Sequence, residues 1–206
     1  MTTIQATGTS ESHYRAERAT ITARISITSR NRSESIAAAS ELHNRIAARA
    51  QQLRDSGDAT WHAADPISTM ARKTYEQGTK SKVVIEHLTT SRVRVKLSNL
   101  ELVGAVVTEL AEAGATTDVD WALTEATKRQ CERHARKAAV GEARRIADDY
   151  AEALGQRIER VVSISDSRGG YGGVQARFAS AGAEAEVSIA EITVSASVTG
   201  EFETAG

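Results

Sequence analysis

Residues 18–29 read Arg-Ala-Thr-Ile-Thr-Ala-Arg-Ile-Ser-Ile-Thr-Ser, and the pattern changes immediately after them. Apolar and polar side chains alternate along this stretch, which predicts a long strand with one buried face. From Asn31 onward the apolar residues recur every three or four positions, as far as Ser56-Gly57. Asn31 and Glu34 have the spacing of a capping box, so the sequence predicts an amphipathic helix directly after the strand.

The same two periods divide the rest of the chain. Further strands are predicted at residues 3–8, 60–63, 67–75, 82–97, 118–123, 157–166 and 190–203. The polar stretch 9–17 is expected to turn the chain back into a hairpin. A short helix is expected to start at a Ser98–Glu101 capping box and to end at Gly114, and a long helix is expected over about 127–154, with Thr127 and Gln130 as its box.

The predicted order is ββαβββαβαββ. Strands cluster between helices instead of alternating with them, which favours an α+β fold with a mainly antiparallel sheet and three helices packed on it. Because Pro, Gly or charge-rich linkers are missing before residue 167, we expect one domain over residues 1–206. The Gly- and Ala-rich residues 167–186 break all periodicity and are expected to form a flexible loop.

Composition excludes several classes of function. The formal net charge is −1 and only 4% of residues are aromatic, so neither the charge nor the stacking surface of a generic nucleic-acid binder is present. Cys131 is the only cysteine, which forbids an intrachain disulfide and is expected to be buried on a helix face. The polar residues that interrupt every apolar stretch, and an N-terminus without the pattern of a signal peptide, favour a cytoplasmic protein without a membrane span.

No motif predicts a catalytic, metal or cofactor site. The histidines are scattered over different elements and are expected to be exposed or locally bonded: His13, His43, His62, His87 and His134. The Gly-rich segment at residues 168–173 lacks the lysine and the following helix of a phosphate-binding loop. Asp118 and Asp120 fit the solvated face of a half-buried strand.

The strongest charge feature lies in the long helix. Its buried stripe is expected to contain Cys131, Ala135, Ala139, Ala143, Ile146, Tyr150 and Leu154. Its basic residues are the candidate partner-binding set: Arg129, Arg133, Arg136, Lys137, Arg144 and Arg145. Because Asp148, Asp149 and Glu152 follow them, the helix is bipolar and could meet a second copy head-to-tail.

Several segments together resemble the SIMPL (DUF541) family. They are the run Asn99–Val107, the turn Ala113-Gly114-Ala115, the strand Val119-Asp120-Trp121, the Ala-rich helix ending at Leu154-Gly155, and the opening and closing strands Ile4–Gly8 and Ile192–Thr199. The resemblance spans nearly the whole chain, and its specificity lies in the order and spacing of the segments.

The resemblance implies a binding or assembly module without established catalytic residues. The family is named for an animal protein that associates with a receptor-associated kinase, and it includes bacterial envelope antigens, one of which forms a ring or channel-like oligomer. We therefore expect a non-enzymatic, self-associating scaffold that contacts itself and another protein.

Two other hypotheses remain open from the residues alone. The first is an enzyme whose site is assembled at a subunit interface, with Arg92, Arg94, Lys96, Asp118 and Asp120 as its candidate residues. The second is an anion-binding or nucleic-acid-binding protein that uses the basic helix, against which the net charge and the few aromatic residues count.

Overall fold

The computed structural model describes residues 1–76, 82–166, 175–177 and 188–205. The chain divides into two compact units. Of the described residues, the central unit comprises those within Glu17–Trp121, and the terminal unit comprises those within Met1–Ala16, Ala122–Ser180 and Ser188–Gly206.

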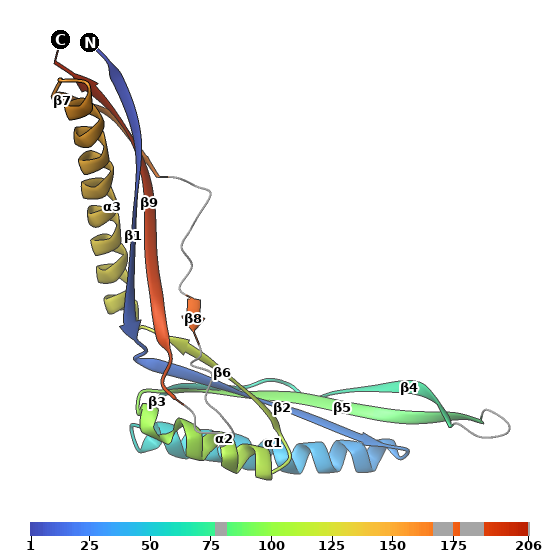
Figure 1. Cartoon of the computed structure of the whole chain (residues 1–206). Coiled ribbons are helices and arrows are strands. Elements are labelled where there is room, and N and C mark those ends of the chain that lie inside the picture. The colour runs from blue at the N-terminus through green and yellow to red at the C-terminus, as the bar shows by residue number, and fades with distance from the viewer. Residues whose placement is uncertain (77–81, 167–174, 178–187, 206) are drawn as a thin grey trace. The chain divides into compact units, whose positions relative to one another are not determined.

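The central unit is an antiparallel sheet with two helices on one face (Figure 1). Its elements are β2 (Arg18–Ser29), α1 (Arg32–Asp55), β3 (Ala59–Ala64), β4 (Ser68–Glu76), β5 (Lys82–Leu97), the 3-10 turn η1 (Leu100–Leu102), α2 (Val103–Glu112) and β6 (Thr116–Ala122). The strand order is β3-β5-β2-β6, and β4 also pairs with β5. Consequently β3 and β4 follow one edge of β5 in succession, with a break at residues 65–67.

The core of this unit lies between the sheet and α1. Alternate side chains of β2 and β5 are buried there against one stripe of α1: Ala19, Ile21, Ala23, Ile25, Val93, Val95, Leu97, Ala39, Leu42, Ile46, Ala50 and Leu53. The helical period predicts this stripe of α1 but also places Ile36 in it, and that prediction is wrong because Ile36 is 36% exposed. Asn31 caps α1 by accepting hydrogen bonds from the Ser33 and Glu34 amides, at 2.9 and 3.5 Å. The predicted strand-to-helix switch at this point is therefore confirmed.

A buried hydroxyl ties α1 to the sheet. The Ser35 Oγ is within hydrogen-bond distance of the Thr89 Oγ1 at 2.6 Å and of the Ile27 and His87 carbonyl oxygens at 3.1 Å. Ser35 and Thr89 are both fully buried. The apolar pattern does not predict this contact, because Ser35 falls outside the stripe.

We expect Ser35→Ala to lower the free energy of unfolding by about 1–3 kcal/mol, since it leaves buried polar atoms with fewer partners. Ser33→Ala is the matched control, because Ser33 is an exposed serine in the same helical turn. Urea unfolding of both variants measures the difference. Equal midpoints would show that the Ser35 hydroxyl contributes nothing to stability.

The terminal unit is an antiparallel sheet covered on one face by a single helix (Figure 1). Its elements are β1 (Thr3–Arg15), α3 (Glu125–Ala153), β7 (Ile158–Asp166), β8 (Gln175–Arg177) and β9 (Glu191–Thr204). The strand order is β1-β9-β7, and β8 also pairs with β9. The first and last strands pair along their whole length, from Thr3 opposite Glu203 to Arg15 opposite Glu191.

The helix α3 packs on this sheet through small residues at every fourth position. The buried stripe is Cys131, Ala135, Ala139, Ala143, Ala147 and Ala151. Four residues turn an α-helix about 40° beyond one full turn, so the stripe drifts around the helix. A twisted pair of strands can follow that drift. The sequence-based stripe is correct up to Ala143 but wrong for Tyr150 and Leu154, which are 56% and 59% exposed.

Gly8 on β1 is the point of closest approach to α3. A Cβ atom built on Gly8 would lie 2.9 Å from the Ala143 Cα and would overlap the Ala143 nitrogen and the Ala139 carbonyl oxygen. The strand and the helix backbone are therefore in direct contact, which only a residue without a side chain permits.

Two local predictions are wrong. The hairpin expected from residues 9–17 does not form, because β1 continues to Arg15 and takes its backbone partners from β9, while β2 pairs with β5. The Ser98–Glu101 capping box is also not formed. The Ser98 Oγ instead donates to the Gly57 and Asp58 carbonyl oxygens, at 3.2 and 3.0 Å.

The start of the long helix also differs from the prediction. α3 begins at Glu125, and Thr124 caps it by accepting a hydrogen bond from the Thr127 amide at 3.3 Å. Thr127 therefore lies in the first turn of α3 and is not its N-cap. The predicted end of α2 is confirmed, since Gly114 has a positive φ of +98°, the left-handed conformation of a residue after a helix.

The predicted α+β class, the antiparallel pairing and the element order are confirmed. The strands are divided between two sheets, with α1 and α2 on one and α3 on the other. Whether residues 1–206 behave as a single domain stays a prediction. The flexible loop expected at residues 167–186 lies outside the described residues, apart from the short strand β8.

Candidate functional site

The residues of the enzyme hypothesis lie on the central sheet, on the face opposite α1 and α2, here called the open face. Arg92, Arg94 and Lys96 alternate with the buried Val93, Val95 and Leu97 of β5, so they project away from the helices. Asp118 on β6 approaches the same face, where its Oδ2 lies 3.4 Å from Arg24 Nη2.

Arg94 is held in place on this face. Its Nη2 donates to Asp65 Oδ1 at 2.8 Å, and its guanidinium lies 5.6 Å from the centre of the Trp61 ring. These contacts neutralise Asp65 and form a cation–π interaction. The Arg94 Nε is buried without a hydrogen-bond partner in the described part of the chain.

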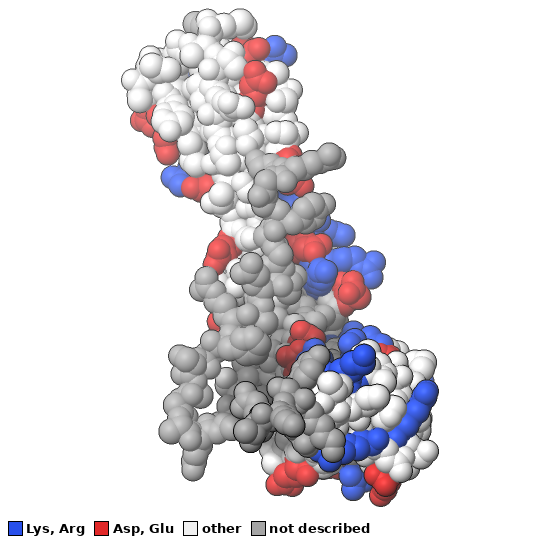
Figure 2. Space-filling view, turned by 90° about the vertical axis from the view of Figure 1, so that its right-hand side faces the viewer, with Lys and Arg blue, Asp and Glu red and all other residues white. Residues whose placement is uncertain are grey.

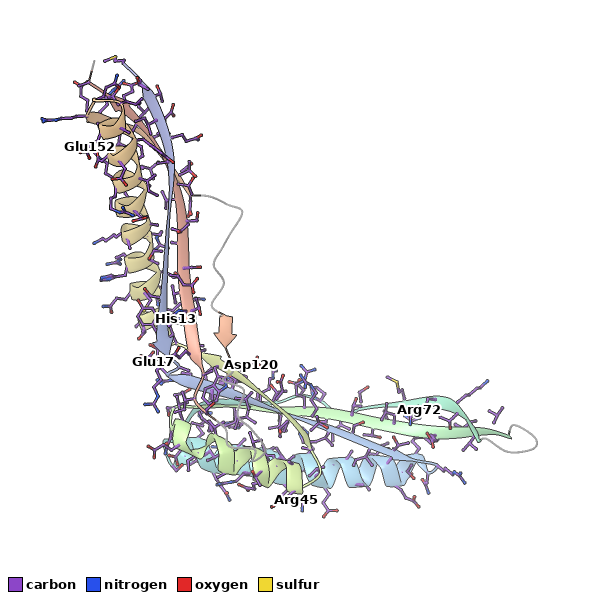
Figure 3. All side chains as sticks on the ribbon, in the orientation of Figure 1. His13, Glu17, Arg45, Arg72, Asp120 and Glu152 are labelled. Atoms are coloured by element: carbon purple, nitrogen blue, oxygen red, sulfur yellow. The ribbon has the colours of Figure 1, made fainter. Side chains whose placement is uncertain are left out.

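Asp120, labelled in Figure 3, is exposed on β6.

A hollow of about 340 Å³ opens on this face beside the break between β3 and β4. Arg24 and Arg92 line it from β2 and β5, and they stand directly opposite each other in the register. The hydroxyl residues Ser26, Thr90 and Ser68 also line it, from β2, β5 and β4. The alternation within β5 predicts Arg92, but the sequence does not predict Arg24 and the hydroxyl residues at this place, because cross-strand neighbours depend on the pairing register.

The basic residues predicted on α3 fall into two groups. Arg129, Arg133, Arg136 and Lys137 are exposed near the N-terminal half of the helix. Arg144 and Arg145 are instead held by acidic residues of the same helix: Arg144 binds Asp148 at 3.0 Å, and Arg145 binds Glu142 at 2.6 Å. The hydrogen bond from Arg145 lowers the pKa of Glu142, and Glu142 raises the pKa of Arg145.

The two groups therefore differ in what they offer to a partner. The group of Arg129, Arg133, Arg136 and Lys137 presents net positive charge to solvent. The charges of Arg144 and Arg145 are largely neutralised by acidic residues of the same helix. The same ion pairs neutralise part of the negative charge at the C-terminal end of α3, because Asp148 contacts Arg144 and Asp149 contacts Arg145. Whether any of the six residues binds a partner stays a prediction. Figure 2 shows that Lys and Arg side chains also gather on the central unit.

The strand β7 is an edge of the terminal sheet with an apolar surface. It pairs with β9 on one side, and in the described ranges no strand pairs with it on the other. Val161, Val162 and Ile164 are 47%, 43% and 46% exposed. Between Val161 and Ile164 the strand has no charged residue and no proline, two of the features that protect an edge from association. Its register with β9 shifts between Val161 and Ser163, and Glu159 and Arg160 precede this apolar stretch.

The other predicted features can be placed briefly. Cys131 is buried in the stripe of α3, as expected. His13 and His43 are locally bonded, to Thr193 and Ser91 respectively. In the described ranges no three His, Cys, Asp or Glu residues are grouped in a way that could hold a metal ion. In the same ranges no helix has the length and hydropathy needed to cross a membrane.

Comparisons with known proteins identify the family of this chain but not an activity. The search of curated proteins found no matching sequence. A crystal structure from Burkholderia cenocepacia, described as a candidate amidohydrolase/peptidase, aligns with 67% of this chain at 12% identity and a TM-score of 0.23. The alignment covers 35% of that protein's chain, and a score this low supports no inference about fold or activity.

The family comparison covers almost the whole molecule. The model described as SIMPL, protein of unknown function (DUF541), matches residues 4–202, from the second residue of β1 to two residues before the end of β9. Both units described above therefore lie within one family pattern, and the resemblance inferred from the sequence is confirmed. The chain belongs to the SIMPL (DUF541) family.

Proposed function

We propose that this protein is a non-enzymatic binding and scaffold module that assembles by pairing of β7 with an edge strand of a second copy. The observation that carries the proposal is the exposed apolar edge formed by Val161, Val162 and Ile164. An unpaired strand edge offers a row of backbone donors and acceptors to another strand, and exposed apolar side chains add burial on contact.

The available edges define the assemblies that this contact can form. Pairing of β7 with β7 of a second copy is isologous and closes as a dimer. Pairing of β7 with the opposite edge strand β1 is heterologous and gives rings or filaments. The side chains of β1 that point away from α3 are mainly polar, among them Thr3, Gln5 and Thr7, so burial favours the β7–β7 contact.

The test is the solution mass of the untagged protein by light scattering after size exclusion. A monomer has a mass of 22.0 kDa, and we expect a discrete multiple of it. Val162→Lys should lower the mass to that of the monomer, since a charged edge residue opposes strand pairing. Val140→Lys is the matched control, because Val140 is similarly exposed, at 38%, but lies on α3.

Two results would contradict the proposal. A wild-type mass of 22.0 kDa at every concentration would show that the edge does not self-associate. An oligomer that survives Val162→Lys but is lost in Val140→Lys would place the contact on the helix instead. The far-ultraviolet circular dichroism of each variant establishes that the fold is retained.

A further inference from the structure

The open face of the central sheet contains two arginines in an arrangement that is unfavourable without a bound anion. Arg24 and Arg92 are directly opposite residues of β2 and β5. Side chains at such positions are separated by about 5 Å at Cβ, and like charges placed there repel. Both arginines are exposed.

The acidic residues nearby do not balance this pair. Asp118 reaches only Arg24, at 3.4 Å. Asp65 lines the hollow, but its carboxylate is bound to Arg94 at 2.8 Å. Arg92 makes no ion pair or side-chain hydrogen bond with any residue in the described part of the chain. Excess positive charge therefore remains at Arg92.

A row of hydroxyl groups lies next to the arginine pair. Ser68, Thr90 and Ser26 are successive neighbours in the register across β4, β5 and β2. Thr90 and Ser26 are each two residues from an arginine on the same strand, so they share its face. The three hydroxyls make no hydrogen bond within the described ranges, and each can donate to a ligand oxygen.

The break between β3 and β4 makes room for a ligand at this place. The Asp65 amide donates to the Arg92 carbonyl oxygen at 2.8 Å. After Asp65 the chain does not pair with β5 again until β4 begins at Ser68. The hollow beside the break has a volume of about 340 Å³. That volume is within the range of small-molecule sites, about 300–1,000 Å³, and exceeds the space that one inorganic ion fills.

We propose that this hollow binds the phosphate group of a small phosphomonoester, with Arg92 and Arg24 as the charged ligands and Ser26, Ser68 and Thr90 as hydroxyl donors. A phosphomonoester carries about −1.5 to −2 charges at neutral pH and has three outer oxygens. It matches two guanidinium groups and several hydroxyl donors better than a carboxylate, which carries one charge. Guanidinium groups also bind phosphate in a two-pronged manner.

The charges around the hollow favour a single phosphate over a nucleic-acid strand. Asp118 and Asp65 flank the two arginines, so a second phosphate further along the face would meet acidic side chains. A polymer would need a continuous basic track. The proposed site is contained in the central unit and does not depend on self-assembly through β7.

The experiment measures the binding of inorganic phosphate and of glycerol phosphate to the full chain by calorimetry, at fixed ionic strength. We expect saturable binding of both probes, with the ester bound at least as tightly because the hollow also accommodates its organic part. Arg92→Gln should weaken binding about tenfold, the effect of losing one charged hydrogen-bonding partner. The phosphate affinity of Arg92→Lys should lie between those of the wild type and Arg92→Gln, because lysine keeps the positive charge but cannot donate two parallel hydrogen bonds as a guanidinium does.

The matched control is Arg45→Gln. Arg45 is an exposed arginine of the same unit that projects from α1 away from the sheet (Figure 3). Its removal should leave phosphate binding unchanged. Without phosphate, Arg92→Gln should raise the midpoint of thermal unfolding, because it removes the repulsion from Arg24. This second readout is independent of the ligand and shows that the variant is folded.

Three results would overturn the proposal. The first is the absence of saturable phosphate binding to the wild-type chain. The second is binding that Arg92→Gln leaves unchanged, which would place the phosphate elsewhere. The third is acetate binding as tightly as phosphate, which would show that the hollow does not select for the phosphate group.

Discussion

Replacing Gly8 with alanine is expected to lower the free energy of unfolding by about 3 kcal/mol, the upper end of the usual cost of overpacking, and so to be among the largest effects of any single substitution in this chain. The added methyl group would overlap the backbone of α3 at Ala139 and Ala143. Side chains can rotate away from an inserted atom, but helix backbone cannot. The whole helix must therefore shift away from β1, and its alanine contacts must loosen together.

Gly141→Ala is the control for this prediction, and we expect the opposite sign. Gly141 lies on α3, and a Cβ atom there would meet nothing within 4 Å. Alanine is favoured over glycine inside a helix by about 0.5–1 kcal/mol, so this variant should be more stable than the wild type. Urea unfolding at one protein concentration measures both variants. Similar midpoints for the two would refute the close approach of β1 and α3.

The second large effect is expected at Phe202, which is 1% exposed in the core of the terminal unit. Its ring packs with Ile4, Ala6 and the alanines of α3. Phe202→Ala should cost about 3–5 kcal/mol.

A double-mutant cycle with Gly200 tests the packing of the Phe202 ring directly. A Cβ atom on Gly200 would lie 2.6 Å from the Cε2 and Cζ atoms of that ring. Gly200→Ala should therefore be destabilising in the wild-type chain and clearly less so when Phe202 is alanine, where the Ile164 Cδ1 at 3.2 Å is the remaining tight contact. Additive effects of the two substitutions would show that the ring does not cover Gly200.

Tyr150→Ala, at an exposed aromatic of α3, should change stability by less than about 0.5 kcal/mol.

The candidate sites were only partly predictable from the sequence. The alternation in β5 correctly predicts that Arg92, Arg94 and Lys96 share a face, because strand geometry places alternate residues together. The opposing arginine, Arg24, belongs to a strand far away in sequence, and its position depends on the register between β2 and β5. In α3, helical spacing predicts the basic residues but not the ion pairs that hold Arg144 and Arg145.

The identity and order of the helices and strands follow from the sequence by itself. The switch after Ser29 from a period of two to a period near four, the Asn31 cap and the glycine that ends α2 are local features, and each acts within a few residues. The buried Cys131 and the small residues of the first half of α3 are predictable for the same reason.

Only the tertiary structure decided which strands pair and which small residues must be small. Residues 9–15 are polar enough for a turn, yet they form strand because β9, from the other end of the chain, supplies their hydrogen-bond partners. The sequence does not show that residue 8 must be glycine, because this requirement comes from the contact between β1 and the backbone of α3. The stripe of α3 continues through Ala147 and Ala151 and not through Tyr150, because it packs on a twisted sheet. Backbone pairing and close packing depend on residues distant in sequence, and local periodicity contains no information about those partners.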